Sequence, residues 1–150
     1  VPLFSHRELR VCFRCVDWLV LQRDRRLEGR GGGWTVLGAE PVLLVRDVGR
    51  SVSHYERLGF TVERQAPTAA VVTHDRSLRL HLSETEWPGR AGHGAVHLVV
   101  PDADEVARAW RAAGVEVVGP EDVDGFFEGA HTDPDGNVIH VRAVAPSPSA

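Results

Sequence analysis

The feature that most constrains the fold is an internal repeat. The segment that begins at Val45 recurs without a gap 55 positions later, and its landmarks correspond at Val45/Val100, Asp47/Asp102, Tyr55/Trp110, Gly59/Gly114 and Val62/Val117. Further along, at an offset of 59, Leu80-His81-Leu82 corresponds to Ile139-His140-Val141. Self-similarity of this kind is typical of a duplicated supersecondary unit. The sequence therefore predicts two copies of one unit that enclose a space between them.

The first copy has the element order βαβββ. A strand is expected at residues 41–46, followed by a helix that Asp47 caps and Gly59 ends. Three short strands, separated by turn-forming residues, are expected at 60–64, 69–73 and 78–83. Each copy is therefore predicted to contain four strands and one helix.

The second copy repeats this order. A strand is expected at 95–100, then a helix that Asp102 and Glu105 open as a capping box and Gly114 ends. Strands are expected near 115–118 and at 127–132 and 138–142, and a turn-forming Asp-Pro-Asp-Gly-Asn sequence joins the last two. Asp133 and Asp135 lie in that turn, so we expect them to accept backbone hydrogen bonds rather than to carry chemistry.

Alternation along the strands gives each sheet two unlike sides. Leu80, Leu82, Val96, Leu98, Ile139 and Val141 make one side apolar, and the helices are expected to cover it. The other side carries Arg79, His81, His97 and His140, and it either faces solvent or lines a groove. If the two copies are related by an approximate twofold axis, His81 and His140 approach each other across that groove.

Composition and charge limit the function classes. The 150 residues, 43% hydrophobic and 25% charged, suffice for one domain with a core. All 17 basic residues are arginine; seven of them, with four acidic residues, lie in residues 1–37, whereas residues 38–150 hold ten arginines and 17 acidic residues. An acidic main domain argues against a nucleic-acid partner and favours neutral or cationic ligands.

Residues 1–37 differ from the rest and are expected to be an extension outside the fold. Their apolar segment at 11–21 contains Arg14 and Asp17, so it is unsuited to a membrane span or a secretory signal, and a cytoplasmic protein is expected. Cys12 and Cys15 form a CxxC pair, which would suit a redox pair or half a zinc site, but a second pair is lacking, and two incidental thiols are the simpler interpretation. The glycines at 29–33 suit a flexible linker.

Residues 38–144 resemble the vicinal oxygen chelate superfamily, which contains glyoxalases, extradiol dioxygenases and bleomycin-resistance proteins. The resemblance rests on the opening from Ala39 to Val48, on Arg57-Leu58-Gly59-Phe60, on Arg79-Leu80-His81-Leu82-Ser83 and on the DPDGN hairpin, and these motifs look most like the bleomycin-resistance branch. It implies an α+β fold in which two βαβββ modules, at 38–86 and 93–144, pair into a cup-shaped, incompletely closed barrel. Residues 145–150 would be a disordered tail.

The bleomycin-resistance branch implies binding without catalysis. Its members are homodimers that sequester a bulky cationic drug in grooves between subunits. The groove residues expected in this chain are Arg79, His81, Trp87, His97, Phe126, Phe127 and His140. Departures from the pattern at Thr68, at His97 and at Gly125-Phe126-Phe127 change the stacking surfaces, although Glu128 stays in register, so the resemblance favours a small-molecule ligand over bleomycin itself.

The same fold also supports metal chemistry. By resemblance, the metal-ligand positions fall at Glu40, His81, Ala95 and His140, and three of these hold side chains that can ligate Fe, Zn, Ni or Mn. His93 and His97 share the parity of Ala95 and could replace it, although each alone is more often a groove-lining or surface histidine than a ligand. A glyoxalase-like lyase or isomerase, or an extradiol-type dioxygenase, is therefore the alternative function. A module that carries a biosynthetic intermediate or recruits a partner is a third.

Overall fold

The computed structural model describes residues 34–147. The chain divides into two units, Val1–Glu40 and Pro41–Ala150. In the first unit the described residues, 34–40, form no helix or strand. The expectations for Cys12, Cys15 and the glycines at 29–33 concern residues outside the described ones.

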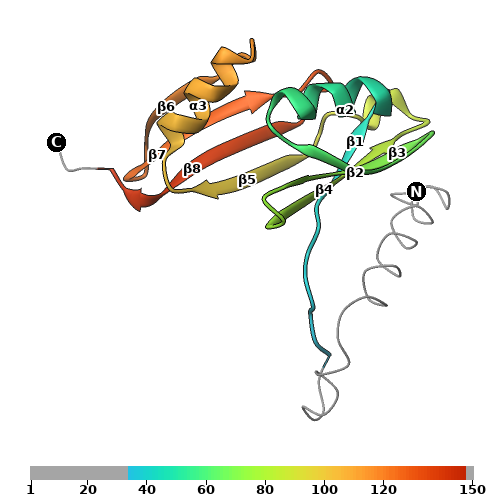
Figure 1. The fold of residues 1–150 in the computed structure, drawn as a ribbon, viewed down its shortest axis with the longest axis horizontal. Coiled ribbons are helices and arrows are strands. Elements are labelled where there is room, and N and C mark those ends of the chain that lie inside the picture. The colour runs from blue at the N-terminus through green and yellow to red at the C-terminus, as the bar shows by residue number, and fades with distance from the viewer. Residues whose placement is uncertain (1–33, 148–150) are drawn as a thin grey trace. The chain divides into compact units, whose positions relative to one another are not determined.

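The second unit contains both predicted modules, and each has the order βαβββ (Figure 1). In module one, strand β1 runs parallel to β4, and the sheet has the order β1-β4-β3-β2. In module two, β5 runs parallel to β8, and the order is β5-β8-β7-β6. Neither four-stranded sheet closes into a barrel, which agrees with the predicted fold class, an incompletely closed barrel. The elements are β1 (Val42–Val45), α2 (Val48–Arg57), β2 (Thr61–Ala66), β3 (Ala69–His74), β4 (Leu78–Glu84), the 3₁₀ turn Pro88–Arg90, β5 (Ala95–Val100), α3 (Ala103–Ala112), β6 (Val118–Val123), β7 (Phe126–Thr132) and β8 (Val138–Pro146).

The repeat in the sequence reappears as a repeat in strand register. Val42 of β1 pairs with His81 of β4, and His97 of β5 pairs with His140 of β8. These two pairs are related by the offsets of 55 and 59 that relate the two copies in the sequence. Equivalent positions of the modules therefore carry one histidine in module one and two stacked histidines in module two.

Both helices begin and end as the sequence predicts. The Asp47 carboxylate accepts a hydrogen bond from the Arg50 amide at 2.7 Å, and the Asp102 carboxylate accepts from Asp104 and Glu105 at 2.9 and 3.1 Å. Gly59 and Gly114, just past the two helices, have φ of 95° and 77°, a conformation that glycine adopts without strain.

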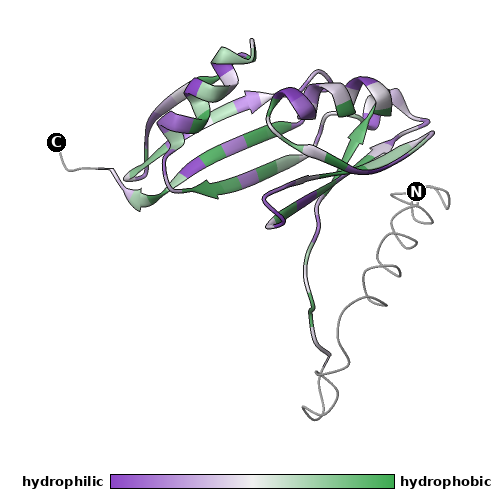
Figure 2. Cartoon of the chain, viewed as in Figure 1, coloured by the Kyte–Doolittle hydropathy of each residue, from purple (hydrophilic) through white to green (hydrophobic). Residues whose placement is uncertain are grey.

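The helices cover the apolar sides of the sheets. Tyr55 of α2 and Leu80 and Leu82 of β4 are almost completely buried, as is Ile139 of β8, and Trp110 of α3 is 3% exposed. Figure 2 shows hydrophilic and hydrophobic residues alternating along β8, as expected for a strand with one covered side. The core expected from the sequence pattern is confirmed.

Two elements differ from the predicted ones, β8 and β6. Strand β8 is expected to end at residue 142 but continues to Pro146, into the segment predicted as a disordered tail. A strand near 115–118 is expected, but β6 begins only at Val118 and continues to Val123. Val115 is 4% exposed, and its amide instead donates to Trp110 O at the end of α3. A proline within a sequence segment argues against a strand there. However, β6 is an edge strand, where a residue without an N–H, such as Pro120, is tolerated. No helix among the described residues is long and apolar enough to cross a membrane.

Candidate functional site

The helix-free side of the module-two sheet carries two stacked imidazoles. The rings of His97 and His140 lie 4.3 Å apart between centroids with an interplanar angle of 5°. Their contact follows from the parallel pairing of β5 and β8, which places the two residues opposite each other on one side of the sheet. His97 is exposed and His140 is half-buried, so both present polar ring atoms to this surface.

A carboxylate from the neighbouring strand fixes one of these rings. His140 Nδ1 lies 2.8 Å from Glu128 Oε1, and because a carboxylate accepts, the imidazole N–H donates. The side chains of His140 and Glu128 are 28% and 13% exposed. In the neutral imidazole the other nitrogen, Nε2, then has a free lone pair for a ligand.

The same side of the sheet also carries a cation over an aromatic ring. The guanidinium carbon of Arg142, two residues beyond His140, lies 4.2 Å from the ring centroid of Phe126. Such a pair is a flat surface on which another planar group can stack. The residues that make up this surface, here called the β5/β7/β8 face, are His97, Val99, Phe126, Glu128, His140 and Arg142.

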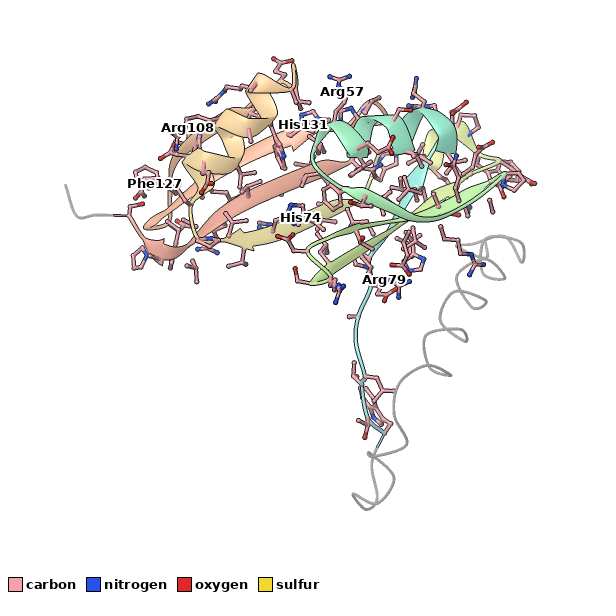
Figure 3. All side chains as sticks on the ribbon, in the orientation of Figure 1. Arg57, His74, Arg79, Arg108, Phe127 and His131 are labelled. Atoms are coloured by element: carbon pink, nitrogen blue, oxygen red, sulfur yellow. The ribbon has the colours of Figure 1, made fainter. Side chains whose placement is uncertain are left out.

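The expected groove residues of module one have different surroundings. Arg79 forms an ion pair with Glu63 (Nη2 to Oε1, 2.6 Å), and in Figure 3 it points away from the side that α2 covers. His81 is buried, with 7% of its surface exposed, and so is Ser83 with 4%. Module one therefore presents less imidazole to its helix-free side than module two does.

Two of the aromatic residues expected in the groove lie elsewhere. Phe127 is next to Phe126 in β7, but alternation turns it to the other side of the strand, where it packs against the hydrophobic core (labelled in Figure 3). Trp87 is 57% exposed and lies just before the 3₁₀ turn, with the Arg90 guanidinium 6.0 Å from its ring. Of the three aromatic residues, only Phe126 contacts another residue of the β5/β7/β8 face, the Arg142 guanidinium.

Three side chains on the β5/β7/β8 face could ligate a metal ion together. His97, Glu128 and His140 each offer one donor atom, and these atoms lie within 4.8 Å of one another. Within residues 34–147 no other group of three histidine, cysteine, aspartate or glutamate side chains meets this condition. The group contains His140 from the ligand set that the resemblance implies, but neither Glu40 nor His81.

A cavity lies next to the β5/β7/β8 face. Its volume is about 340 Å³, at the lower end of the range for small-molecule sites. It lies between the modules, and His97 borders both the cavity and the face. The cavity is lined by Leu58, Phe60, His74, Ser77, Leu78, His97, Leu98, Val99, Val100, Val106 and Trp110.

The Asp133–Asn137 turn is structural, as the sequence predicts. Asp133 Oδ1 accepts from the amides of residues 135, 136 and 137 at 2.8–2.9 Å. Its Oδ2 accepts from Tyr55 Oη at 3.0 Å and from Asn137 Nδ2 at 3.0 Å. Burial, followed by the charge and hydrogen bond of Asp133, raises the pKa of Tyr55, so its hydroxyl stays protonated and donates.

Two further groups of contacts join the modules, and sequence reasoning did not find them. His54 of α2 and His131 of β7 lie with their Nε2 atoms 2.8 Å apart, and Asp135 accepts from Arg46, Arg50 and Ser51. Figure 3 shows His131 on the helix side of its sheet. Contacts between residues 77 to 89 positions apart depend on how the modules pack, which no local pattern reveals.

Comparison with known proteins places the chain among proteins of this architecture. The profile of the Glyoxalase/Bleomycin resistance protein/Dioxygenase superfamily matches residues 37–141. None of the curated proteins compared matches the sequence.

Several solved structures are similar over their full length. A bleomycin-binding protein from Streptomyces verticillus, solved with copper(II)-bleomycin, is 29% identical, covers 75% of this chain and 100% of its own, and has a TM-score of 0.68. A glyoxalase/bleomycin resistance protein from Catenulispora acidiphila is 28% identical over 73% of this chain and 100% of its own, with a TM-score of 0.63. An antibiotic binding protein from a Streptomyces species is 23% identical over 77% and 100%, with a TM-score of 0.64.

Proposed function

The chain belongs to the glyoxalase/bleomycin resistance protein/dioxygenase superfamily, and from this premise we propose that it binds an antibiotic-like small molecule and sequesters it without turnover. The ligand occupies a groove between two copies of the chain. The bleomycin-binding protein from Streptomyces verticillus, 29% identical over its whole length, supports a ligand of this kind.

The observation that carries this proposal is the composition of the β5/β7/β8 face. The His97 and His140 rings and the Phe126–Arg142 pair offer planar surfaces beside hydrogen-bonding atoms. None of these four residues belongs to the hydrophobic core, so core packing does not account for them. A flat heteroaromatic ligand gains both stacking and hydrogen bonds on such a surface.

Charge supports a cationic ligand. The protein has a net charge of −4, and the acidic residues exceed the arginines only within residues 38–150. A field of this sign raises the local concentration of cations and accelerates their capture. Glu128 places one carboxylate directly on the proposed binding surface.

Exposed apolar side chains support a groove between two copies. Val42 of β1 and Val99 of β5 are 38% and 66% exposed, and each lies on the helix-free side of its sheet, where Val42 pairs with His81 and Val99 pairs with Arg142. A second copy laid against these sides would remove their apolar surface from water. The ligand would then be enclosed rather than held on an open sheet.

The test is calorimetric titration of the full chain with metal-free bleomycin and with other cationic planar antibiotics, together with sedimentation equilibrium. We expect a dimer that binds at least one such drug, with the drug recovered unchanged by mass spectrometry. His97→Ala should weaken binding about tenfold, whereas His93→Ala, which removes an exposed histidine four residues earlier, should leave it unchanged.

Two outcomes contradict this function. A monomer that binds none of the drugs would refute it. Turnover of a hemithioacetal or catechol that needs Fe, Zn, Ni or Mn and is lost in His81→Ala would instead support the metal-dependent enzyme that uses Glu40, His81 and His140.

A further inference from the structure

We propose that His97, Glu128 and His140 form a binding site for a divalent transition metal ion on the β5/β7/β8 face. The site needs no organic ligand, so it can be tested apart from the proposed function. It shares His140 with the ligand set implied by the family resemblance, but it takes its other two ligands from the same sheet. All three donors therefore come from one module.

The donor atoms already lie near the spacing that a metal ion requires. At metal–nitrogen and metal–oxygen distances of about 2.0–2.2 Å, two donors on one ion are roughly 3.2 Å apart. His140 Nδ1 and Glu128 Oε1 are 2.8 Å apart, so an ion that replaces the proton between them needs a displacement of only a few tenths of an ångström. The sheet register supplies this pair without further rearrangement.

The third donor is the most adaptable of the three. His97 is stacked parallel to His140, and a lone pair in the plane of its ring does not point at an ion held by the other two. Because the side chain is exposed, its ring can turn about the terminal torsion, which is broad for histidine. Its donor lies within 4.8 Å of the other two, and rotation of the ring is the movement that we infer brings it to the ion.

Of the charges around the site, the Glu128 carboxylate favours a bound cation and the Arg142 guanidinium opposes it. Two neutral imidazoles and one carboxylate give the site one negative charge when it is empty. Arg142 is the nearby positive group, and its guanidinium lies over the Phe126 ring, where the aromatic face offsets part of its charge. The negative charge of the donors therefore still attracts a cation although Arg142 lies nearby.

The donor set determines which ions bind. Two nitrogens and one carboxylate oxygen suit Zn²⁺, Ni²⁺, Co²⁺ and Cu²⁺, whereas Mg²⁺ and Ca²⁺ prefer sites made wholly of oxygen. Three protein ligands leave at least one coordination position open. That position faces the exposed side of the sheet, where water or an added ligand can reach it.

The experiment is titration of the full chain with Zn²⁺ alone and with Co²⁺ alone, followed by calorimetry and by the visible absorption of bound Co²⁺. The background carries Cys12→Ser and Cys15→Ser, since thiolates bind the same ions. We expect one equivalent per chain, binding lost in His140→Ala, and affinity reduced at least tenfold in His97→Ala and in Glu128→Gln. Mg²⁺ and Ca²⁺ should not compete.

The controls separate a specific site from scattered surface histidines. His93→Ala and His74→Ala remove exposed histidines outside the cluster and should bind Zn²⁺ like the background protein. His97 is itself exposed, so His97→Ala should keep its circular dichroism spectrum and thermal transition even where His140→Ala disturbs the sheet. Equal affinity in the background protein and in His97→Ala and Glu128→Gln would overturn the proposal, as would an equal loss in the two controls.

Discussion

His54 and His131 share a single hydrogen bond between their Nε2 atoms, 2.8 Å apart, inside the junction of the two modules. His131 Nδ1 lies 2.6 Å from the Glu116 carbonyl, which only accepts, so Nδ1 carries the proton. Neutral His131 therefore accepts at Nε2, and His54 donates. The rings are stacked, with centroids 4.9 Å apart, and His54 and His131 are 8% and 6% exposed.

Because of this histidine pair, we expect the protein to lose stability in mild acid. Burial, and then the neighbouring His131, lower the pKa of His54 from 6.5 to about 4. Between pH 6.5 and about 4, His54 is therefore protonated in the unfolded chain but neutral in the folded chain. The free energy of unfolding should fall as the pH drops through this range, by on the order of 2 kcal/mol. Urea denaturation at a series of pH values measures this. His54→Gln should flatten the dependence, whereas His74→Gln, at an exposed site, should not.

Tyr55→Phe should destabilise the protein with little change in packing. The Tyr55 hydroxyl is the only group removed, and it donates to the buried Asp133 carboxylate. A hydrogen bond to a charged group contributes about 1.5–3 kcal/mol, and that is the expected loss in urea denaturation. Ser53→Ala, which removes an exposed hydroxyl bonded within the same helix, is the matched control and should change stability by under about 0.5 kcal/mol. Equal effects of the two substitutions would show that the junction bond contributes nothing.

Gly92→Ala should be far more damaging than Gly59→Ala. Both glycines have positive φ, 80° and 95°, so both substitutions strain the backbone. A Cβ at Gly92 would lie 1.8 Å from the Asp135 carbonyl oxygen, whereas a Cβ at Gly59 would meet nothing within 4 Å. We expect a loss of about 1 kcal/mol at Gly59 and roughly 3 kcal/mol or more at Gly92, measured as thermal or urea midpoints.

Phe126→Ala and Phe127→Ala should separate binding from stability. Phe126 lies under the Arg142 guanidinium, and Phe127 packs against the core. Alanine at 126 should weaken binding of a planar drug about tenfold while the thermal transition stays within a few degrees, and alanine at 127 should lower the transition with little effect on the affinity of the remaining folded protein. The reverse pattern in calorimetry and thermal denaturation would place the ligand on the helix side.

Most of the fold follows from local sequence signals. Asp47 and Asp102 predict the helix starts, Gly59 and Gly114 the ends, and the DPDGN sequence the turn between β7 and β8, because each acts through contacts a few residues away. The position of β6 is wrong in the prediction, since Val115 packs at the helix end and an edge strand accepts Pro120.

The candidate site is harder to predict from local sequence signals. Parity alone predicts that His97 and His140 lie on the side of the sheet away from the helix. Their stacking depends in addition on the parallel pairing of β5 with β8, which the sequence pattern did not predict. The hydrogen bond between Glu128 and His140 depends on the register of β7 against β8, which is irregular between Phe126 and Glu128. The His54–His131 pair depends on the packing of one module against the other, and no periodicity in either segment encodes that.

The Asp133–Asn137 turn also makes the unfolding of one module depend on that of the other. Asp133 and Asp135 are buried in module two, but Tyr55, Arg46, Arg50 and Ser51, which satisfy them, belong to module one. If module one unfolded alone, two carboxylates would lose these partners, and a half-folded chain would be strongly disfavoured. Although the chain contains two similar modules, it should unfold in one transition, and neither module should persist as an independent domain.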